Sequence, residues 1–236
     1  MPAVAVWEPE GENWIRWART PGFDAYWYFR DAVFDAVLPP PSGRALEVGC
    51  GEGRVTRDLV ERGHDVVALD PARTLARAAA DADSTGRYAI ADGHELPFPD
   101  DGFDLVVSYN VLQNVADLPR AVREINRVLK PGGALCVCVI HPVTDLGDFE
   151  DHADGPRFTL RERYFDARRI EETEERDGIS MTFRGWTYPL EDYMRALETA
   201  GLRIDRIREP RPSGHPERYD RWLDVPLFLA LRAIKP

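Results

Sequence analysis

A glycine-rich turn follows the first short apolar segment of the chain, in the order Glu47-Val48-Gly49-Cys50-Gly51-Glu52-Gly53. Glycine has no Cβ, so the backbone can bend tightly there and approach a ligand closely. The pattern typical of nicotinamide dinucleotide sites has a third glycine at its sixth position, where this chain has Arg54. The turn therefore predicts a nucleotide-like ligand other than a nicotinamide dinucleotide.

Three acidic side chains are expected to line the crevice beside this turn. Glu47 precedes the first glycine, Asp70 ends the second apolar segment, and Asp92 ends the third. An acid about twenty residues after such a turn can bind both hydroxyls of a ribose, and Asp92 would lie near the amino group of an adenine. An acidic crevice disfavours a pyrophosphate, and it favours a ligand that carries a sulfonium and an ammonium.

Short apolar segments alternate with helical patterns along most of the chain. Five segments rich in Val, Leu and Ile suit strands that are buried on both faces: residues 45–48, 66–69, 88–91, 105–108 and 134–140. The clearest helix covers residues 118–129, with Asp117 as its N-cap and Pro131-Gly132-Gly133 after its end. This alternation predicts an α/β fold with a mostly parallel, doubly wound sheet.

The flanking segments complete the expected domain. An aromatic stripe over residues 23–38 predicts a helix that covers the sheet, and residues 190–200 predict another helix. Residues 202–207 and 227–233 are expected to add two antiparallel strands, which gives seven. Residues 141–189 are polar and poorly periodic, with possible strands at 159–170 and 179–183, and a connection of this length usually has a function. We expect one domain with a helical cap (1–43), a cofactor-binding core (44–140), a substrate lid (141–189) and a C-terminal part (190–236). Within the lid, the acidic run 171–175 is expected to face solvent.

Composition narrows the class of protein. The 236 residues include 30 Lys and Arg against 41 Asp and Glu, a net charge of −11, which disfavours binding to nucleic acids and to anionic membranes. The first residues lack the pattern of a signal peptide, and no apolar segment approaches the roughly 20 residues of a membrane span. Three cysteines, Cys50, Cys136 and Cys138, show no metal-binding spacing, so a cytoplasmic protein with structural thiols is expected.

Together these motifs resemble the class I S-adenosylmethionine-dependent methyltransferases. The residues that carry the resemblance are 47–53, Asp70, Asp92, 96–107 and 127–133. Within that superfamily the chain is similar to the small-molecule branch that includes the ubiquinone and menaquinone biosynthesis methyltransferases, and the similarity covers roughly residues 13 to 236. It implies a Rossmann-like, doubly wound, seven-stranded sheet with S-adenosyl-L-methionine as cofactor and S-adenosyl-L-homocysteine as product.

The resemblance also assigns cofactor-binding roles by position. It places Gly49, Cys50 and Gly51 beside the methionine part, Glu47 at the ammonium, Asp70 at the ribose, Pro71, Asp92 and Gly93 around the adenine, and Asn110 beside the methionine. Two departures are visible: Thr187-Tyr188 stands where relatives often have His-Arg, and Gln113 stands where many have His. A general base that the family draws from those histidines is therefore absent.

Two further candidates come from their positions in the predicted elements. Arg30 lies on the otherwise apolar face of the 23–38 helix, and we hypothesise that it binds the cofactor carboxylate; an arginine paired within the protein is the alternative. His141 follows the fifth strand at the ligand-binding edge of the sheet and is a candidate general base, with a structural histidine as the alternative. Gln113, Tyr164, Trp186 and Tyr188 are expected to line the substrate cavity, although aromatic residues in such a segment can equally serve packing.

The expected function is methyl transfer from S-adenosylmethionine to an oxygen, nitrogen or carbon atom of a small-molecule acceptor. A non-catalytic or regulatory S-adenosylmethionine-binding protein and a nicotinamide-dependent oxidoreductase are the alternatives. A monomer or homodimer without metal, nucleic acid or membrane partners is expected.

Overall fold

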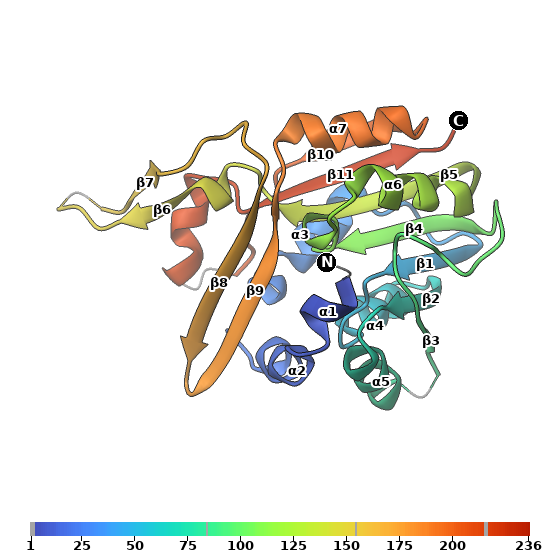
Figure 1. The fold of residues 1–236 in the computed structure, drawn as a ribbon, viewed down its shortest axis with the longest axis horizontal. Helices are drawn as coiled ribbons and strands as arrows, with labels where there is room; N and C mark the ends of the chain where they lie inside the picture. The colour runs from blue at the N-terminus through green and yellow to red at the C-terminus, as the bar shows by residue number, and fades with distance from the viewer. Residues whose placement is uncertain (1–2, 84, 154, 215–216) are drawn as a thin grey trace.

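A seven-stranded sheet forms the centre of the molecule (Figure 1). The computed structural model describes residues 3–83, 85–153, 155–214 and 217–236. The strand order is β10-β11-β5-β4-β1-β2-β3. The bounds are β1 Arg44–Val48, β2 Asp65–Asp70, β3 Arg87–Ile90, β4 Phe103–Tyr109, β5 Leu129–Ile140, β10 Arg203–Arg208 and β11 Phe228–Ile234. Strands β1 to β5 pair in parallel, whereas β11 is antiparallel to both β5 and β10, which confirms the predicted fold class.

Helices cover both faces of this sheet, as a doubly wound fold requires. On one face, α3 (Tyr26–Val37) and α4 (Arg54–Glu61) bury aromatic and branched side chains against β1, β4 and β5. On the other face, α6 (Leu118–Val128) and α7 (Leu190–Thr199) cover a second apolar layer. Helix α5 (Arg73–Ala82) packs Ala79 against Ala68 of β2. The carboxyl ends of the parallel strands stay free of these layers.

Helix α6 shows how the local sequence determines where a helix begins and which face it buries. The Asp117 side chain accepts a hydrogen bond from the Arg120 N–H at 3.0 Å, and Pro119 occupies the first turn, where its missing N–H costs nothing. Leu118, Val122 and Ile125 are buried on one face of the helix. The helix predicted over 118–129 is therefore confirmed, and β5 begins directly after it at Leu129.

Segments outside the sheet enclose its carboxyl edge. Two helices that the sequence pattern did not predict, α1 (Ala3–Trp7) and α2 (Gly11–Arg19), precede α3. The segment after β5 forms two hairpins, β6 (Gly147–Glu150) with β7 (Arg157–Leu160) and β8 (Arg168–Arg176) with β9 (Ile179–Thr187). The strand predicted over 159–170 is wrong: a loop separates the end of β7 from the start of β8. The remaining elements are short 3₁₀ turns, η1 (Leu112–Asn114), η2 (Thr144–Leu146) and η3 (Glu217–Leu223).

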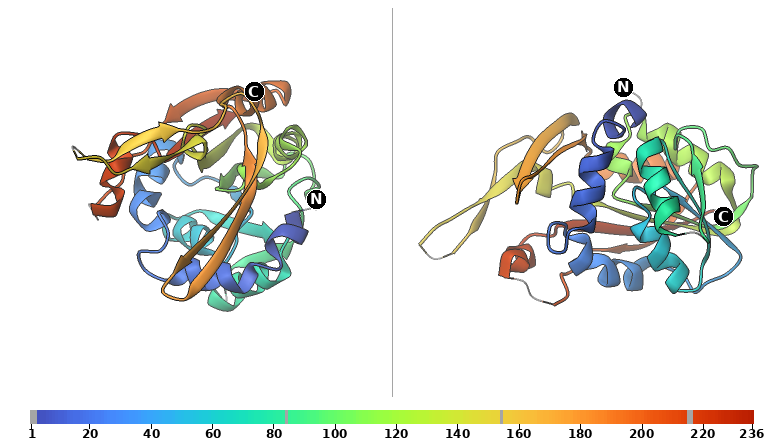
Figure 2. Two further views of the ribbon diagram at one scale, coloured as in Figure 1. Left: turned by 60° about the vertical axis from the view of Figure 1, so that its left-hand side comes forward. Right: turned by 90° about the horizontal axis from the view of Figure 1, so that it is seen from below.

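The β8–β9 hairpin reaches across to α2 (Figure 2). Trp17 of α2, Phe23 and Met181 of β9 are buried together in a small core of their own, with Trp14 and Phe183 packed against it. The N-terminal helices and the hairpin, far apart in sequence, thus close over the same edge of the sheet. Among the described residues no helix is both long enough and apolar enough to cross a membrane.

Candidate active site

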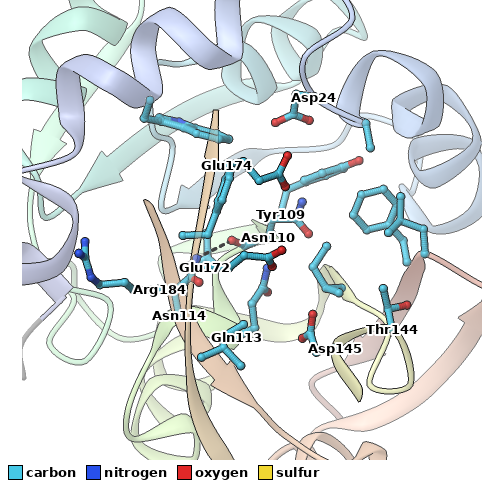
Figure 3. Close-up of a pocket in the computed structure, with 18 of the residues that line it drawn as sticks. Asp24, Tyr109, Asn110, Gln113, Asn114, Thr144, Asp145, Glu172, Glu174 and Arg184 are labelled. Carbon is cyan, nitrogen blue, oxygen red and sulfur yellow. Dashed lines mark hydrogen bonds between the residues drawn. The ribbon is translucent and has the colours of Figure 1, made fainter. Parts of the chain in front are cut away.

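A cavity of about 990 Å³ lies at the carboxyl edge of β1 and β4 (Figure 3). The sheet side of its wall comes from the glycine-rich turn, Asp70 and Asn110, and the opposite side comes from β8 and β9. Trp14 and Trp17 close it on the α2 side, and Phe149 and Trp222 lie at a further wall. This is the edge at which doubly wound sheets bind ligands.

The glycine-rich turn approaches the cavity with its backbone. Gly49 has φ +79°, and a Cβ placed on it would lie 2.4 Å from Cγ2 of Val111, so only glycine fits. The Gly51 N–H donates to Oδ2 of Asp70 at 2.9 Å, which ties the turn to the end of β2. Cys50 is buried, its Sγ donates to the Gly51 carbonyl at 3.7 Å, and burial raises the pKa of its thiol.

Two of the predicted acids are buried in the cavity wall. Glu47 accepts a hydrogen bond from the Thr56 hydroxyl, and burial raises the pKa of Glu47 to about 8. Asp70 accepts N–H bonds from Gly51 and Ala72, yet burial raises the pKa of Asp70 to about 6. A positively charged ligand group would compensate for the unfavourable burial of these charges.

Arg54 is a buried positive group next to the glycine-rich turn. It opens α4 directly after Gly53 and is buried, with its guanidinium 4.3 Å from the ring centre of Tyr26. Its Nη2 pairs with Asp24 at 3.0 Å, but its buried Nη1 has no hydrogen-bond partner among the described residues. A buried guanidinium N–H without a partner is costly, so the cavity offers a binding point for a ligand oxygen.

Two amides at the end of β4 also present unpaired atoms. Asn110, with φ +57°, lines the cavity, and its buried Oδ1 has no hydrogen-bond partner among the described residues. Gln113 in η1 is 7% exposed, lines the same cavity and has an unpartnered Oε1. Both predicted positions therefore offer hydrogen-bond acceptors to a ligand.

Asp92 and Gly93 line an adjoining cavity of about 30 Å³ instead of the large one. Gly49 and Pro71 line both cavities, so the two spaces lie next to each other. The Asp92 carboxylate contacts Nδ1 of His94 at 2.6 Å. The structure thus brings all nine positions that the resemblance assigned to the cofactor to one edge of the sheet.

Arg30 and His141 lie outside both cavities. The Arg30 guanidinium pairs with both oxygens of Asp58 at 3.0 Å and packs on Trp27, so the structure favours the alternative of an arginine paired within the protein. His141 accepts the Val143 N–H on Nδ1, and its Nε2 lies 3.3 Å from Glu209. Both ring nitrogens are therefore engaged in holding the chain after β5, and burial lowers the pKa of His141.

Three aromatic residues expected at the substrate cavity also lie outside it. The Tyr164 hydroxyl accepts the Leu190 N–H at 3.0 Å, and the Tyr188 hydroxyl donates to the Val115 carbonyl at 2.8 Å. Trp186 stacks on Tyr188 with 6.3 Å between ring centres. These side chains secure the base of the hairpin to η1 and α7, so their role in the structure is packing.

Sequence reasoning missed the residues that the hairpin contributes. The acidic run 171–175 was expected to face solvent, and all of it except Glu174 is exposed, but Glu171, Glu172 and Glu174 also line the cavity, as does Asp145 of η2. The signal for Arg54 was its place directly after the last glycine of the turn.

Comparison with known proteins agrees with this geometry. Residues 46–137 match the family model described as "Methyltransferase domain". A solved S-adenosylmethionine-dependent methyltransferase from Mesorhizobium loti superposes with a TM-score of 0.71 at 25% identity, covering 89% of this chain and 98% of that one. Over this domain and across the whole fold, the chain is similar to S-adenosylmethionine-dependent methyltransferases. This similarity indicates S-adenosylmethionine as the cofactor.

Two curated methyltransferases show the range of the similarity. The malonyl-[acyl-carrier protein] O-methyltransferase of Halorhodospira halophila is 31% identical over 193 residues, which are 75% of this chain and 64% of that protein. The demethylmenaquinone methyltransferase of Clavibacter sepedonicus is 35% identical over 120 residues, 50% of this chain and 48% of that protein. The chain spans about half the length of the curated relatives that it matches.

Proposed function

We propose that this chain transfers the methyl group of S-adenosylmethionine to a small-molecule acceptor that binds under the β8–β9 hairpin. The observation that carries the proposal is the set of complementary groups around the glycine-rich turn. Buried acids, an unpaired amide oxygen and an unpaired guanidinium N–H line one cavity. Their charges match a ligand that carries a sulfonium, an ammonium and a carboxylate.

Each residue has a role that its position supports. Glu47 would bind the ammonium, Arg54 the carboxylate and Asp70 the ribose hydroxyls. Pro71, Asp92 and Gly93 would enclose the adenine at the adjoining cavity. Arg54 replaces Arg30 as the carboxylate ligand, because Arg54 lines the cavity and Arg30 does not, and the buried Nη1 of Arg54 has no partner among the described residues.

The bound cofactor supplies a methyl group activated by its positive sulfur, and the protein's contribution is mainly geometric. The hairpin and α2 cover the edge of the sheet, and their aromatic side chains bound the space left for the acceptor. Holding an acceptor atom in line with the methyl carbon can lower the barrier by up to roughly 7 to 11 kcal/mol. His141 has no part in this scheme.

The partners and location follow from the same observations. We infer a cytoplasmic protein that acts as a monomer or homodimer without a nucleic-acid partner. The net charge of −11 supports the last point, and three buried free thiols support a reducing compartment.

Calorimetric titration with S-adenosylhomocysteine tests the proposal. We expect wild-type protein to bind this product and not NAD. Asp70→Asn should weaken binding at least tenfold, because the ribose loses a charged partner. The matched control Asp65→Asn changes an exposed acid at the other end of β2 and should leave affinity unchanged.

Turnover is tested separately with methyl-labelled S-adenosylmethionine and a small-molecule extract. Extract-dependent transfer of label, lost in Asp70→Asn, is expected. Binding of NAD in place of S-adenosylhomocysteine would overturn the cofactor assignment, whereas binding without any transfer would leave a non-catalytic binding protein.

A further inference from the structure

Strand β8 lines the cavity with one carboxylate, Glu172, that the protein leaves unpaired. Arg168 donates through Nη2 to the backbone carbonyl of Asp145 at 2.9 Å, while its buried Nη1 has no hydrogen-bond partner among the described residues, and Arg176 donates to the Phe23 carbonyl and pairs with Glu174. The two arginines thereby fix both ends of the strand. The Glu172 side chain, between them, is exposed, has no ion pair or hydrogen bond among the described residues, and lines the cavity.

A second free carboxylate lies on the opposite side of the same space. Asp145 of η2 lines the cavity, and within the described part of the chain its side chain has no hydrogen bond or ion pair. Figure 3 shows Asp145, Glu172 and Gln113 around one space. Gln113 is 93% buried, and its unpartnered Oε1 adds an acceptor that points to a ligand with N–H groups.

The electrostatics of this corner are unfavourable without a ligand. Burial and the charge of Glu172 raise the pKa of Asp145 to about 7, although the charge of Arg168 acts in the opposite direction. Burial, Glu174 and Asp148 likewise raise the pKa of Glu172. A cation between the two carboxylates would relieve this repulsion, whereas an anionic acceptor would increase it.

We infer that the methyl acceptor is a small amine, bound as its cation between Asp145 and Glu172 with an N–H directed to Gln113. The inference rests on the proposed function and names its substrate class. Phe149 lies 5.2 Å from Phe158 and 5.1 Å from Trp222, between ring centres, and all three line the cavity. This wall suits an amine with an apolar or aromatic body.

Asp145 also has a chemical role in this scheme. An ammonium has no lone pair, so one proton passes from the nitrogen to the Asp145 carboxylate before transfer. The nitrogen lone pair then forms the new N–C bond, the S–CH₃ bond breaks, and the positive charge passes from sulfur to the methylated nitrogen. Asp145 thus takes the place of the general base expected at His141.

Calorimetry with matched probes tests the inference. Phenethylamine and tryptamine are compared with 2-phenylethanol and phenylacetate, with and without saturating S-adenosylhomocysteine. We expect both amines to bind at least tenfold more tightly than the alcohol and the acid. Asp145→Asn and Glu172→Gln should each weaken amine binding at least tenfold, and the control Glu175→Gln, an exposed position on the other face of β8, should change it less than twofold.

Several results would overturn the inference. These are preference for the alcohol or the acid, amine binding that neither substitution weakens, binding of Mg²⁺ in place of the amines, and failure of both amines to bind. Affinity for S-adenosylhomocysteine should stay within twofold of wild type in all three variants. Loss of S-adenosylhomocysteine binding by the wild-type protein would instead count against the proposed function, so the two failures are distinguishable.

Discussion

At the scale of single residues, the cofactor carboxylate has two candidate ligands. The proposed function assigns it to Arg54, whereas helix periodicity suggested Arg30. Both arginines are paired within the protein, Arg54 with Asp24 and Arg30 with Asp58, and each has one buried nitrogen without a partner among the described residues, but only Arg54 lines the cavity. Arg54→Met should lower affinity for S-adenosylhomocysteine at least tenfold, since hydrogen bonds to charged groups contribute about 1.5–3 kcal/mol. Affinity for 5′-methylthioadenosine, which lacks the carboxylate, should change little, and the matched Arg30→Met should change neither.

Titration with both ligands provides an internal control for folding. A general loss of structure in Arg54→Met would weaken both ligands equally, whereas loss of a carboxylate contact weakens only one. A tenfold loss for S-adenosylhomocysteine in Arg30→Met, with Arg54→Met unaffected, would restore the assignment made from helix periodicity.

At the scale of elements, the contact between α2 and β9 closes one side of the cavity wall. Met181 is fully buried between Trp17 and Phe23, in a core separate from those of the sheet. Met181→Ala should cost about 2–5 kcal/mol, concentrated in this closure. In this variant, hydrogen exchange should become faster at the backbone amides of α2 and β9 and stay slow in β1 and β4. The control Ser180→Ala, on the exposed face of β9, should leave exchange in all four elements unchanged. Equal acceleration in the central strands would show that the closure is not a separate unit.

The elements also divide into those that the sequence predicted and those that it did not. Strands β1 and β11 were predicted because buried strands have continuous apolar runs, and α6 was predicted from its cap and period. Strand β9 (Ile179–Thr187) was predicted in part, over 179–183, whereas β8 has a single apolar residue, Ile170, so its bounds and the contact of Glu172 with the cavity were missed. Short motifs could place the predicted cofactor residues at one edge of the sheet, whereas the pairing of Arg30 with Asp58 and of His141 with Glu209 cannot be seen in local spacing, because the partners are distant in sequence.

At the scale of the whole molecule, the acidic cavity makes stability depend on pH. The pKa values of Glu47, Asp70 and Asp145 are all raised by burial, to about 8, 6 and 7. A carboxyl group whose pKa is raised by folding stays protonated in the folded protein at a pH where it is ionised in the unfolded chain. The folded state therefore binds more protons than the unfolded state. The free energy of unfolding of the ligand-free protein should therefore fall as pH rises from about 5 to 8 and level off above that.

Glu47 should make the largest single contribution to this slope, on the order of 3 to 5 kcal/mol, because its pKa has the largest rise, from the ordinary value of 4.5 to about 8. Denaturant unfolding at pH 5.5 and 8.5 measures the slope, which Glu47→Gln should flatten and the exposed control Glu198→Gln should not.

S-adenosylhomocysteine should stabilise wild-type protein more at pH 8.5 than at pH 5.5. Its ammonium favours the ionised form of Glu47, which burial disfavours in the ligand-free protein. If the free energy of unfolding of the ligand-free protein rose with pH, these acids would not be buried without compensation. The physical reason to expect a cationic ligand in this cavity would then be lost.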